Sequence, residues 1–253
     1  KGPPMTFRVA ICGTGAIGGY YGAAMIRAGH DVTLIDPWPE NVETIRRAGL
    51  TIAGMSEGDQ YTVPAHPLHI GDVQGLVRQA PFEAIFIALK AYDTAWSTRM
   101  MLEWLAPGGV MVALQNSYTE PTIAEIAGPE RTYGCAITAL ACEMTGPGLV
   151  RRLSPDGHSI VGALTPEADA EGAKTARLAE LLACVDTATP TRNLAGVKWS
   201  KLVVNSMRNG LSGLTGMSGR ERDNDPATVR LGMMLGAQAV QTGRAMGLEL
   251  VNT

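Results

Sequence analysis

The sequence predicts an α/β protein with a doubly wound, mostly parallel sheet followed by an all-helical C-terminal region. Short apolar runs alternate with helical periodicity from Thr6 to about Asn116, a β-rich stretch follows, and helical patterns dominate after about residue 192. Of the 253 residues, 45% are hydrophobic and 18% are charged. That composition can bury a substantial core and excludes a disordered chain.

The first part of the chain alternates strands with helices. The predicted strands are Phe7–Cys12, Asp31–Ile35, Phe82–Leu89 and Gly109–Leu114, and the predicted helices are Ala16–Ala28, Pro39–Ala48 and Ala91–Leu105. Repetition of strand, helix, strand indicates parallel strands with helices on both faces of the sheet.

The second part of the chain changes its residue pattern twice, first to β-rich segments and then to helical ones. Arg131–Leu164 is β-rich with Gly146-Pro-Gly148 and Pro155-Asp-Gly157 turns, typical of antiparallel strands. The remaining predictions are a helix over Pro166–Cys184, a polar connection over Val185–Asn193, and helices over Leu194–Leu214 and Asp225–Met246, the last with Asp223-Asn-Asp-Pro226 as its start signal. We therefore expect a domain boundary near residue 192, with an α/β domain over residues 5–192 and a helical domain over 193–253.

Charge and cysteine usage exclude several classes of protein. A formal net charge of −3 leaves no excess of positive charge for binding nucleic acid or an anionic membrane. No apolar run reaches the roughly 20 residues of a membrane span, and the N-terminus does not resemble a signal peptide, so we expect a cytoplasmic protein. The four cysteines (Cys12, Cys135, Cys142 and Cys184) lack metal-ligand or disulfide spacing, so neither a metal site nor a disulfide framework is expected.

A glycine-rich turn follows the first strand and opens the first helix. Gly13 permits the tight turn, Gly15 lets the backbone approach a pyrophosphate, and Gly18 lets the helix pack closely on the strand. Asp36 ends the second strand, 18 residues later, where a carboxylate can accept hydrogen bonds from ribose hydroxyls and disfavours a 2′-phosphate. The pattern predicts a Rossmann-type NAD(P)H site with NADH favoured, although the glycines and Asp36 alone also fit a plain turn and a strand end. The predicted cofactor-binding residues of the turn are Gly13, Thr14, Gly15, Ala16, Ile17 and Gly18.

A polar stripe marks the first C-terminal helix. Lys201, Asn205 and Asn209 lie at i, i+4 and i+8, which places one cation and two amides on one helix face. An ammonium beside two amides suits a carbonyl and a carboxylate, because the lysine can protonate a developing alkoxide while the amides orient the substrate. The same stripe also fits an ordinary solvated face.

Taken together and in order, these motifs resemble the ketopantoate reductase (2-dehydropantoate 2-reductase) family. The ordered set comprises the Gly13 turn, Ala88-Leu-Lys90-Ala-Tyr-Asp-Thr94, Leu114-Gln-Asn116, Pro147-Gly-Leu-Val150 and Trp199-Ser-Lys-Leu-Val-Val-Asn205 with Asn209. The resemblance covers nearly the whole chain. It implies that residues 5–192 form a dinucleotide-binding Rossmann-type domain and that residues 193–253 form a helical substrate or dimerisation domain. It implies hydride transfer from a nicotinamide to C2 of a branched 2-oxo acid, giving the D-2-hydroxy acid, and a place in pantothenate biosynthesis.

The resemblance also implies residue roles. Lys201 corresponds to the proton donor, Asn205 and Asn209 to substrate-binding residues, and Lys90 and Asn116 to residues near both cofactor and substrate. A lysine or asparagine at a strand end can equally cap the next helix.

The chain departs from the family pattern at several places. Ser117-Tyr-Thr-Glu120 replaces the usual Gly-x-Gly, and Asp36-Pro37 stands where many NADP-using members carry an arginine. The family's substrate-contacting asparagine about ten residues after Asn209 is replaced in this chain, near Gly219. The chain reaches Thr253 before the late helices that supply a serine and a glutamate to the family's active site, so we expect an incomplete helical domain.

Three other functions stay open at this level. Asp36 and Tyr118 favour an NAD-dependent D-2-hydroxy acid dehydrogenase acting on bulkier, mandelate-like acids. A non-catalytic dinucleotide-binding module needs the Gly13 turn but not Lys201 or the two asparagines. A β-hydroxyacid dehydrogenase shares a lysine-asparagine helix but fits Arg131–Leu164 poorly. The expected partner is a small 2-oxo acid, and a homodimer is an option that the sequence does not test.

Overall fold

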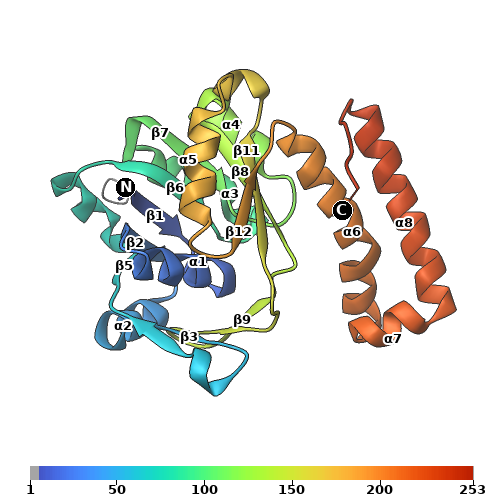
Figure 1. The fold of residues 1–253 in the computed structure, drawn as a ribbon, viewed down its shortest axis with the longest axis horizontal. Coiled ribbons are helices and arrows are strands. Elements are labelled where there is room, and N and C mark those ends of the chain that lie inside the picture. Colours follow the sequence, from blue (N-terminus) through green and yellow to red (C-terminus); the bar gives the residue numbers. More distant parts are fainter. Residues whose placement is uncertain (1–5, 253) are drawn as a thin grey trace.

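The computed structural model describes residues 6–252 and is built around an eight-stranded sheet (Figure 1). The strand order is β12-β11-β8-β7-β6-β1-β2-β5. The bounds are β1 (Arg8–Cys12), β2 (Asp31–Asp36), β5 (His66–His69), β6 (Phe82–Ile87), β7 (Leu105–Ala113), β8 (Thr132–Thr138), β11 (His158–Ala163) and β12 (Thr187–Pro190). The six strands from β5 to β8 are parallel and follow the order 3-2-1-4-5-6 of a Rossmann sheet, whereas β11 runs antiparallel to β8 and parallel to β12.

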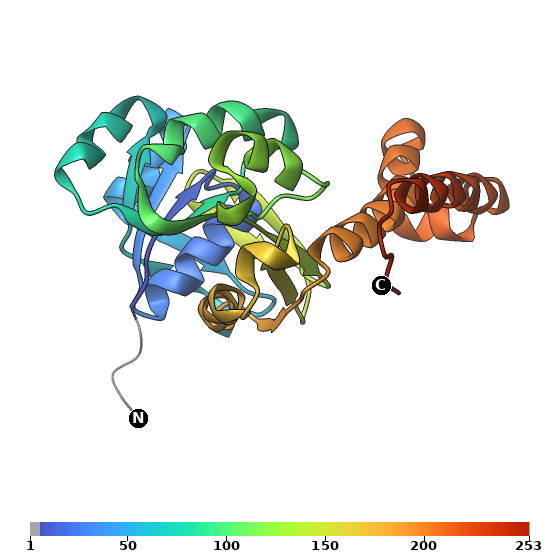
Figure 2. The same cartoon turned by 90° about the horizontal axis from the view of Figure 1, so that it is seen from above.

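Helices cover both faces of this sheet, as the view from above shows (Figure 2). One face carries α1 (Ala16–Arg27) and α5 (Ala173–Leu182), and the other carries the 3₁₀ segment η2 (Ile70–Arg78), α3 (Thr94–Leu102) and α4 (Glu120–Ala127). A further helix, α2 (Pro39–Ala48), packs beside β5 at the sheet edge.

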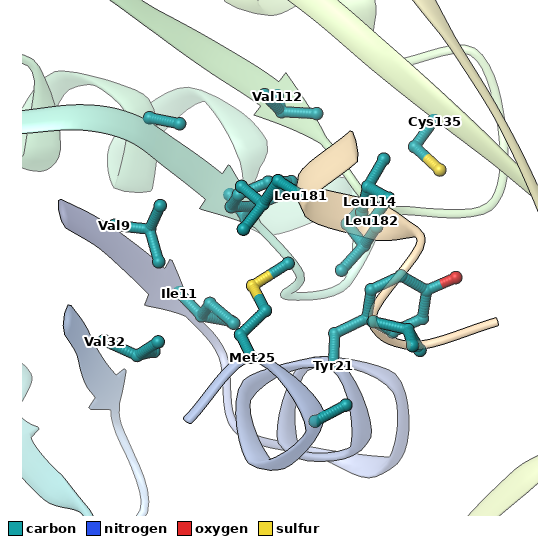
Figure 3. Packing of buried hydrophobic residues seen from close by; sticks show 14 of the residues in the cluster. Val9, Ile11, Tyr21, Met25, Val32, Val112, Leu114, Cys135, Leu181 and Leu182 are labelled. Carbon is teal, nitrogen blue, oxygen red and sulfur yellow. The ribbon is translucent and has the colours of Figure 1, made fainter. Parts of the chain in front are cut away.

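Alternate residues of the central strands fill two separate cores, as the two-residue period of a strand requires. Val9 and Ile11 of β1 pack with Tyr21 and Met25 of α1 on one face, together with α5 (Figure 3). Ala10 and Cys12 pack on the opposite face with residues such as Leu76 and Met101. Because both faces are buried, β1 reads in sequence as a continuous apolar run.

A second, four-stranded sheet joins two segments that are far apart in the sequence. Its order is β4-β3-β10-β9, with β3 (Leu50–Ala53), β4 (Tyr61–Val63), β9 (Cys142–Gly146) and β10 (Leu149–Arg152). β10 pairs in parallel with β3 and antiparallel with β9. This sheet packs against α1.

The C-terminal region is helical and extends away from the sheet (Figures 1 and 2). It consists of α6 (Leu194–Thr215), the short α7 (Gly219–Asn224) and α8 (Pro226–Ala245). α8 packs along α6 through Gly232, Gly236 and Gly243, where an added Cβ would press on Met207 or Trp199 of α6. These glycines allow the two helices to approach closely.

The structure confirms the predicted fold class and corrects several elements. The single helix predicted over Pro166–Cys184 is wrong: Gly172 adopts φ +73° and separates the 3₁₀ turn η5 (Pro166–Asp169) from α5. The predicted connection Val185–Asn193 contains β12, whose Pro190 is tolerated at the sheet edge. The helix predicted over Ala91–Leu105 ends at Leu102 and begins as the 3₁₀ turn η3 (Ala91–Asp93). Several further elements were not predicted at all. They are the strands β3, β4 and β5, the 3₁₀ segments η1 (Glu57–Asp59), η2 and η4 (Pro129–Arg131), and α7.

The remaining expectations from the sequence concern the domain boundary, membrane-spanning helices, metal ligands and cysteines. The predicted domain boundary near residue 192 falls between β12 and α6 and stays a prediction. Across residues 6–252 no helix combines the length and the apolarity needed to cross a bilayer. Within the same range no cluster of metal-ligating side chains occurs, and all four cysteines are free thiols.

Candidate active site at the carboxyl ends of the strands

The turn after β1 requires glycine at two positions and is open at a third. Gly13 has φ +100°, and a Cβ there would lie 2.8 Å from the backbone nitrogen of Leu89. A Cβ on Gly18 would overlap the carbonyl oxygen of Gly13, so both positions require glycine. Gly15 differs, because a Cβ there would meet no atom within 4 Å. The open side of the turn therefore lies at Gly15, at the N-terminus of α1, whose first amide groups have no helical partners.

Asp36 reaches this turn from the end of β2. Its Oδ2 accepts hydrogen bonds of 2.6 Å from both the amide and the hydroxyl of Thr14, and its Oδ1 accepts one of 2.9 Å from the amide of Trp38. The carboxylate is buried, with 6% of the residue exposed. Oδ2 is thus saturated, and Oδ1 keeps room for one further hydrogen bond.

Asn41 of α2 completes the same network. It donates to the hydroxyl of Thr14 at 2.9 Å and accepts from the amide of Gly148, which lies between β9 and β10, at 2.8 Å. Thr14 and Asn41 are both fully buried. Three segments of the chain therefore fix the conformation of the glycine turn.

Lys90 and Asn116 follow the ends of β6 and β7, beside the point where the strand order reverses between β1 and β6. The side chain of Gln115 joins these two segments, because its amide donates to the carbonyls of Leu89 and Lys90 at 2.9 and 3.0 Å. The side chains of Lys90 and Asn116 are exposed. In a doubly wound sheet this is the crevice in which ligands bind.

Lys201 of α6 meets Asn116 at this crevice. Its ammonium donates to Oδ1 of Asn116 at 2.8 Å and to the carbonyl oxygen of Ile137 in β8. Asn205 and Asn209 continue along the same face of α6, the first half-buried and the second exposed. The structure therefore brings Lys201 and Asn116 into direct contact and extends the polar stripe outward from that point.

Burial changes the acidity of Lys201. Desolvation, followed by the positive charge of Lys198, lowers the pKa of the Lys201 ammonium from 10.5 to about 8, while Cys135 of β8 acts weakly in the opposite direction. A lysine with this pKa can give up a proton near neutral pH and recover it from solvent, as a general acid must.

The loop after Asn116 differs from an ordinary turn. Ser117 has φ +80°, a conformation that costs an L-residue about 1–2 kcal/mol. Tyr118 packs edge-to-face on Trp199 of α6, with ring centroids 6.0 Å apart. The loop and helix that carry Asn116 and Lys201 therefore also share an aromatic contact.

The sequence did not lead us to predict a buried ion pair between Glu120 and Lys198, which precedes Lys201 by three residues on α6. Lys198 of α6 lies 2.9 Å from Glu120 at the start of α4 and donates to the carbonyl of Gln115 at 2.7 Å. Both charged side chains are almost fully buried. The spacing of Lys198 and Lys201 at i and i+3 was a signal, because it places both lysines near one helix face.

Comparison with known proteins points to one family. A model described as "Ketopantoate reductase PanE/ApbA" matches residues 9–166. The chain is 27% identical to the 2-dehydropantoate 2-reductase of Nostoc sp. over 214 residues, which cover 81% of this chain and 62% of that protein. It is 28% identical to the 2-dehydropantoate 2-reductase of Pyrococcus horikoshii over 220 residues, covering 86% and 67%, respectively. The chain thus spans less than two thirds of the Nostoc relative.

Solved structures share the fold. A ternary structure of D-mandelate dehydrogenase with NADH and anilino(oxo)acetate superposes with a TM-score of 0.86 at 21% identity, over 96% of this chain and 75% of that one. The PanE/ApbA family ketopantoate reductase from Ralstonia eutropha JMP134 gives a TM-score of 0.81 at 24% identity, over 97% and 76%. At these identities the likeness establishes the fold alone.

Proposed function

Because the chain belongs to the ketopantoate reductase family, whose model matches more than half of its length, we propose that it takes part in NAD(P)H-dependent reduction of a branched 2-oxo acid to the D-2-hydroxy acid. A bound nicotinamide supplies the hydride that C2 of the substrate receives. The protein supplies the groups that bind and orient the two molecules and the proton that the carbonyl oxygen takes up.

Lys201 is the proton donor in this proposal. Its ammonium donates a proton to the substrate oxygen as that oxygen gains negative charge, and the resulting amine is protonated again from solvent. Asn116 holds the lysine through the 2.8 Å hydrogen bond, and Asn205 and Asn209 bind the substrate along the α6 face. Lys90, at the end of the neighbouring strand, offers a second cation for a carboxylate or a phosphate.

We propose NADH as the preferred cofactor. Gly13, Thr14, Gly15, Ala16, Ile17 and Gly18 would hold the pyrophosphate, and Lys90 and Asn116 would lie near the nicotinamide. The free acceptor capacity of Asp36 Oδ1 would be available to a ribose hydroxyl. A 2′-phosphate would meet a buried carboxylate that already accepts three hydrogen bonds, which is electrostatically unfavourable.

The contact between Lys201 and Asn116 carries the proposal. A non-catalytic dinucleotide-binding module needs the glycine turn. It does not need a partly desolvated lysine with a pKa near 8 in the crevice where the nicotinamide would lie. The proposal therefore depends on the chemistry of one side chain.

Initial rates with NADH and NADPH, each paired with ketopantoate and with benzoylformate, test the activity. We expect turnover with NADH, and a Lys201→Met variant should lose at least about 10²-fold in kcat/KM while its Kd for NADH stays within about twofold. Lys174→Met, on the exposed face of α5, is the matched control and should keep the parent rate. Parent-like turnover by Lys201→Met would refute the assignment of the proton donor, and no turnover with any pair would favour the binding module.

A second candidate is an NAD-dependent D-2-hydroxy acid dehydrogenase for mandelate-like acids. The edge-to-face pair of Tyr118 and Trp199 favours it, since aromatic rings beside the reacting groups suit an aromatic substrate. A kcat/KM at least tenfold higher for benzoylformate than for ketopantoate would support this alternative, and the reverse ratio would support the pantoate-forming reaction.

A further inference from the structure

The segment from Gln115 to Glu120 is a short loop whose two ends touch the same buried side chain. Lys198 Nζ donates to the carbonyl oxygen of Gln115 at 2.7 Å and lies 2.9 Å from Oε1 of Glu120. Between these two anchors lie Asn116, the strained Ser117 and Tyr118. One ammonium group on α6 therefore holds the start and the end of the loop that presents Asn116.

The pair is unusually well buried for two charged groups. Lys198 and Glu120 have 2% and 0% of their side chains exposed. Burial is also the main cause that raises the pKa of the Glu120 carboxyl, and the ammonium of Lys198 opposes it. Removing two charges from water costs free energy that their attraction does not always recover, so a buried ion pair is weak evidence for stability. A role in positioning the loop explains the pair better.

Gln115 links the clamp to the rest of the crevice. Its side-chain amide bonds the carbonyls of Leu89 and Lys90, while its own carbonyl accepts from Lys198. A change at Lys198 would therefore reach the loops after both β6 and β7.

We propose that the Lys198–Glu120 ion pair is a positioning device: it clamps both ends of the 115–120 loop to α6 and so fixes where Asn116 meets the ammonium of Lys201. This proposal rests on the proposed function, in which Lys201 is the proton donor. Lys198 and Glu120 act through Lys201 and Asn116 and touch neither substrate nor cofactor.

The clamp also determines the charge that Lys201 experiences. Besides burial, Lys198 on its own helix lowers the pKa of Lys201 and Cys135 on β8 raises it, and Glu120 of α4 lies beside Lys198 with the opposite charge. Removal of the Lys198 charge should therefore make Lys201 a weaker acid, and removal of the Glu120 charge should make it a stronger one.

Competitive labelling of Lys201 with trace acetic anhydride across pH 6–11 measures its pKa in the whole protein without any substrate. We expect a midpoint near pH 8 in the parent. The midpoint should rise by about one pH unit in Lys198→Met, fall in Glu120→Gln and stay in place in Lys198→Arg and in the exposed control Lys174→Met. Equal midpoints in all variants, or shifts of one sign in both Lys198→Met and Glu120→Gln, would overturn the proposal.

Kinetics with NADH and a 2-oxo acid provide the second readout. The double variant Lys198→Met/Glu120→Leu removes both buried charges and should remain folded, as such replacements commonly do. Its kcat should fall at least about tenfold at an unchanged KM for NADH, whereas Lys198→Arg should keep kcat within about threefold. A folded double variant with parent kcat and a parent labelling midpoint would show that the pair serves packing only.

The two proposals fail in distinguishable ways. If the parent reduces no 2-oxo acid, the proposed function fails, while labelling still tests the clamp. If Lys201→Met abolishes turnover but the labelling midpoints do not move, only the clamp fails. If the double variant does not fold, the opposite shifts expected for Lys198→Met and Glu120→Gln decide the question.

Discussion

Substitution of Gly15 by alanine should separate dinucleotide binding from folding. The backbone at Gly15 has φ −71°, which L-residues adopt without strain, and a Cβ there meets no protein atom within 4 Å. Alanine lowers the entropy of the unfolded chain, which raises the free energy of unfolding by about 0.4–1 kcal/mol. It is a poorer N-cap than glycine, which lowers the free energy of unfolding by a similar amount. The free energy of unfolding should therefore change by less than about 0.5 kcal/mol.

The affinity for NADH should change far more than the free energy of unfolding. The methyl group would stand where a phosphate oxygen must come within about 3 Å of the first amide groups of α1, so it would displace the anion and break or stretch about two charge-assisted hydrogen bonds. At about 1.5 kcal/mol each, the loss is about 3 kcal/mol, or roughly 100-fold in Kd.

Urea denaturation measures the first quantity, and NADH titration by calorimetry or by energy transfer from tryptophan measures the second. Gly75→Ala in η2 is the matched control, because a Cβ there also meets no atom within 4 Å and the residue lies away from the glycine turn. An unchanged Kd for NADH in a folded Gly15→Ala variant would refute the argument that the open side of the turn receives the pyrophosphate.

Three further predictions concern Lys201, Ser117 and Gly243. The kcat/KM for reduction should be level below about pH 7 and fall tenfold per unit above about pH 8, because the lowered pKa of Lys201 leaves less of the proton-donating form; a level profile through pH 10 would exclude Lys201 as the acid. Ser117→Gly should raise the free energy of unfolding by up to about 1 kcal/mol, since it removes the strain of φ +80° at a smaller entropic cost, and a loss of stability in urea would contradict this. Gly243→Ala should destabilise the protein by about 2–3 kcal/mol, because the methyl would collide with the indole of Trp199; a parent-like thermal midpoint would show that α8 can move away from α6 without cost.

Much of the main sheet was predictable because its strands are buried on both faces. The predicted runs in β1, β6 and β7 are mostly apolar, and β2 is buried at five of its six positions. The helix α2 begins and ends where its proline and glycine signals indicate. The missed strands are short and polar or lie at edges. β5 contains two histidines and a proline, and β3 finds its parallel partner β10 almost a hundred residues later. Local periodicity contains no information about such pairing.

The candidate site was partly predictable for a similar reason. Carboxyl ends of parallel strands meet at one edge, so the approach of Asn116 to the strand-end crevice followed from topology, and the helix period placed Lys201, Asn205 and Asn209 on one face. The Lys198–Glu120 pair could not be predicted in the same way. Charged residues are normally expected at the surface, and only the three-dimensional structure shows that Lys198 is buried beside Glu120, the first residue of α4.

The hydrogen bond from Gly148 to Asn41 has a consequence for the order in which the protein folds. Asn41 holds Thr14 in the glycine turn, but its own oxygen is satisfied by an amide 107 residues further along the chain. A nascent chain that has just completed β7 already has the glycine turn, yet the β9–β10 hairpin that braces it has not been synthesised. We therefore expect the glycine turn to reach its final conformation late, and a fragment cut before residue 140 to bind dinucleotide poorly even though it contains every glycine of the turn.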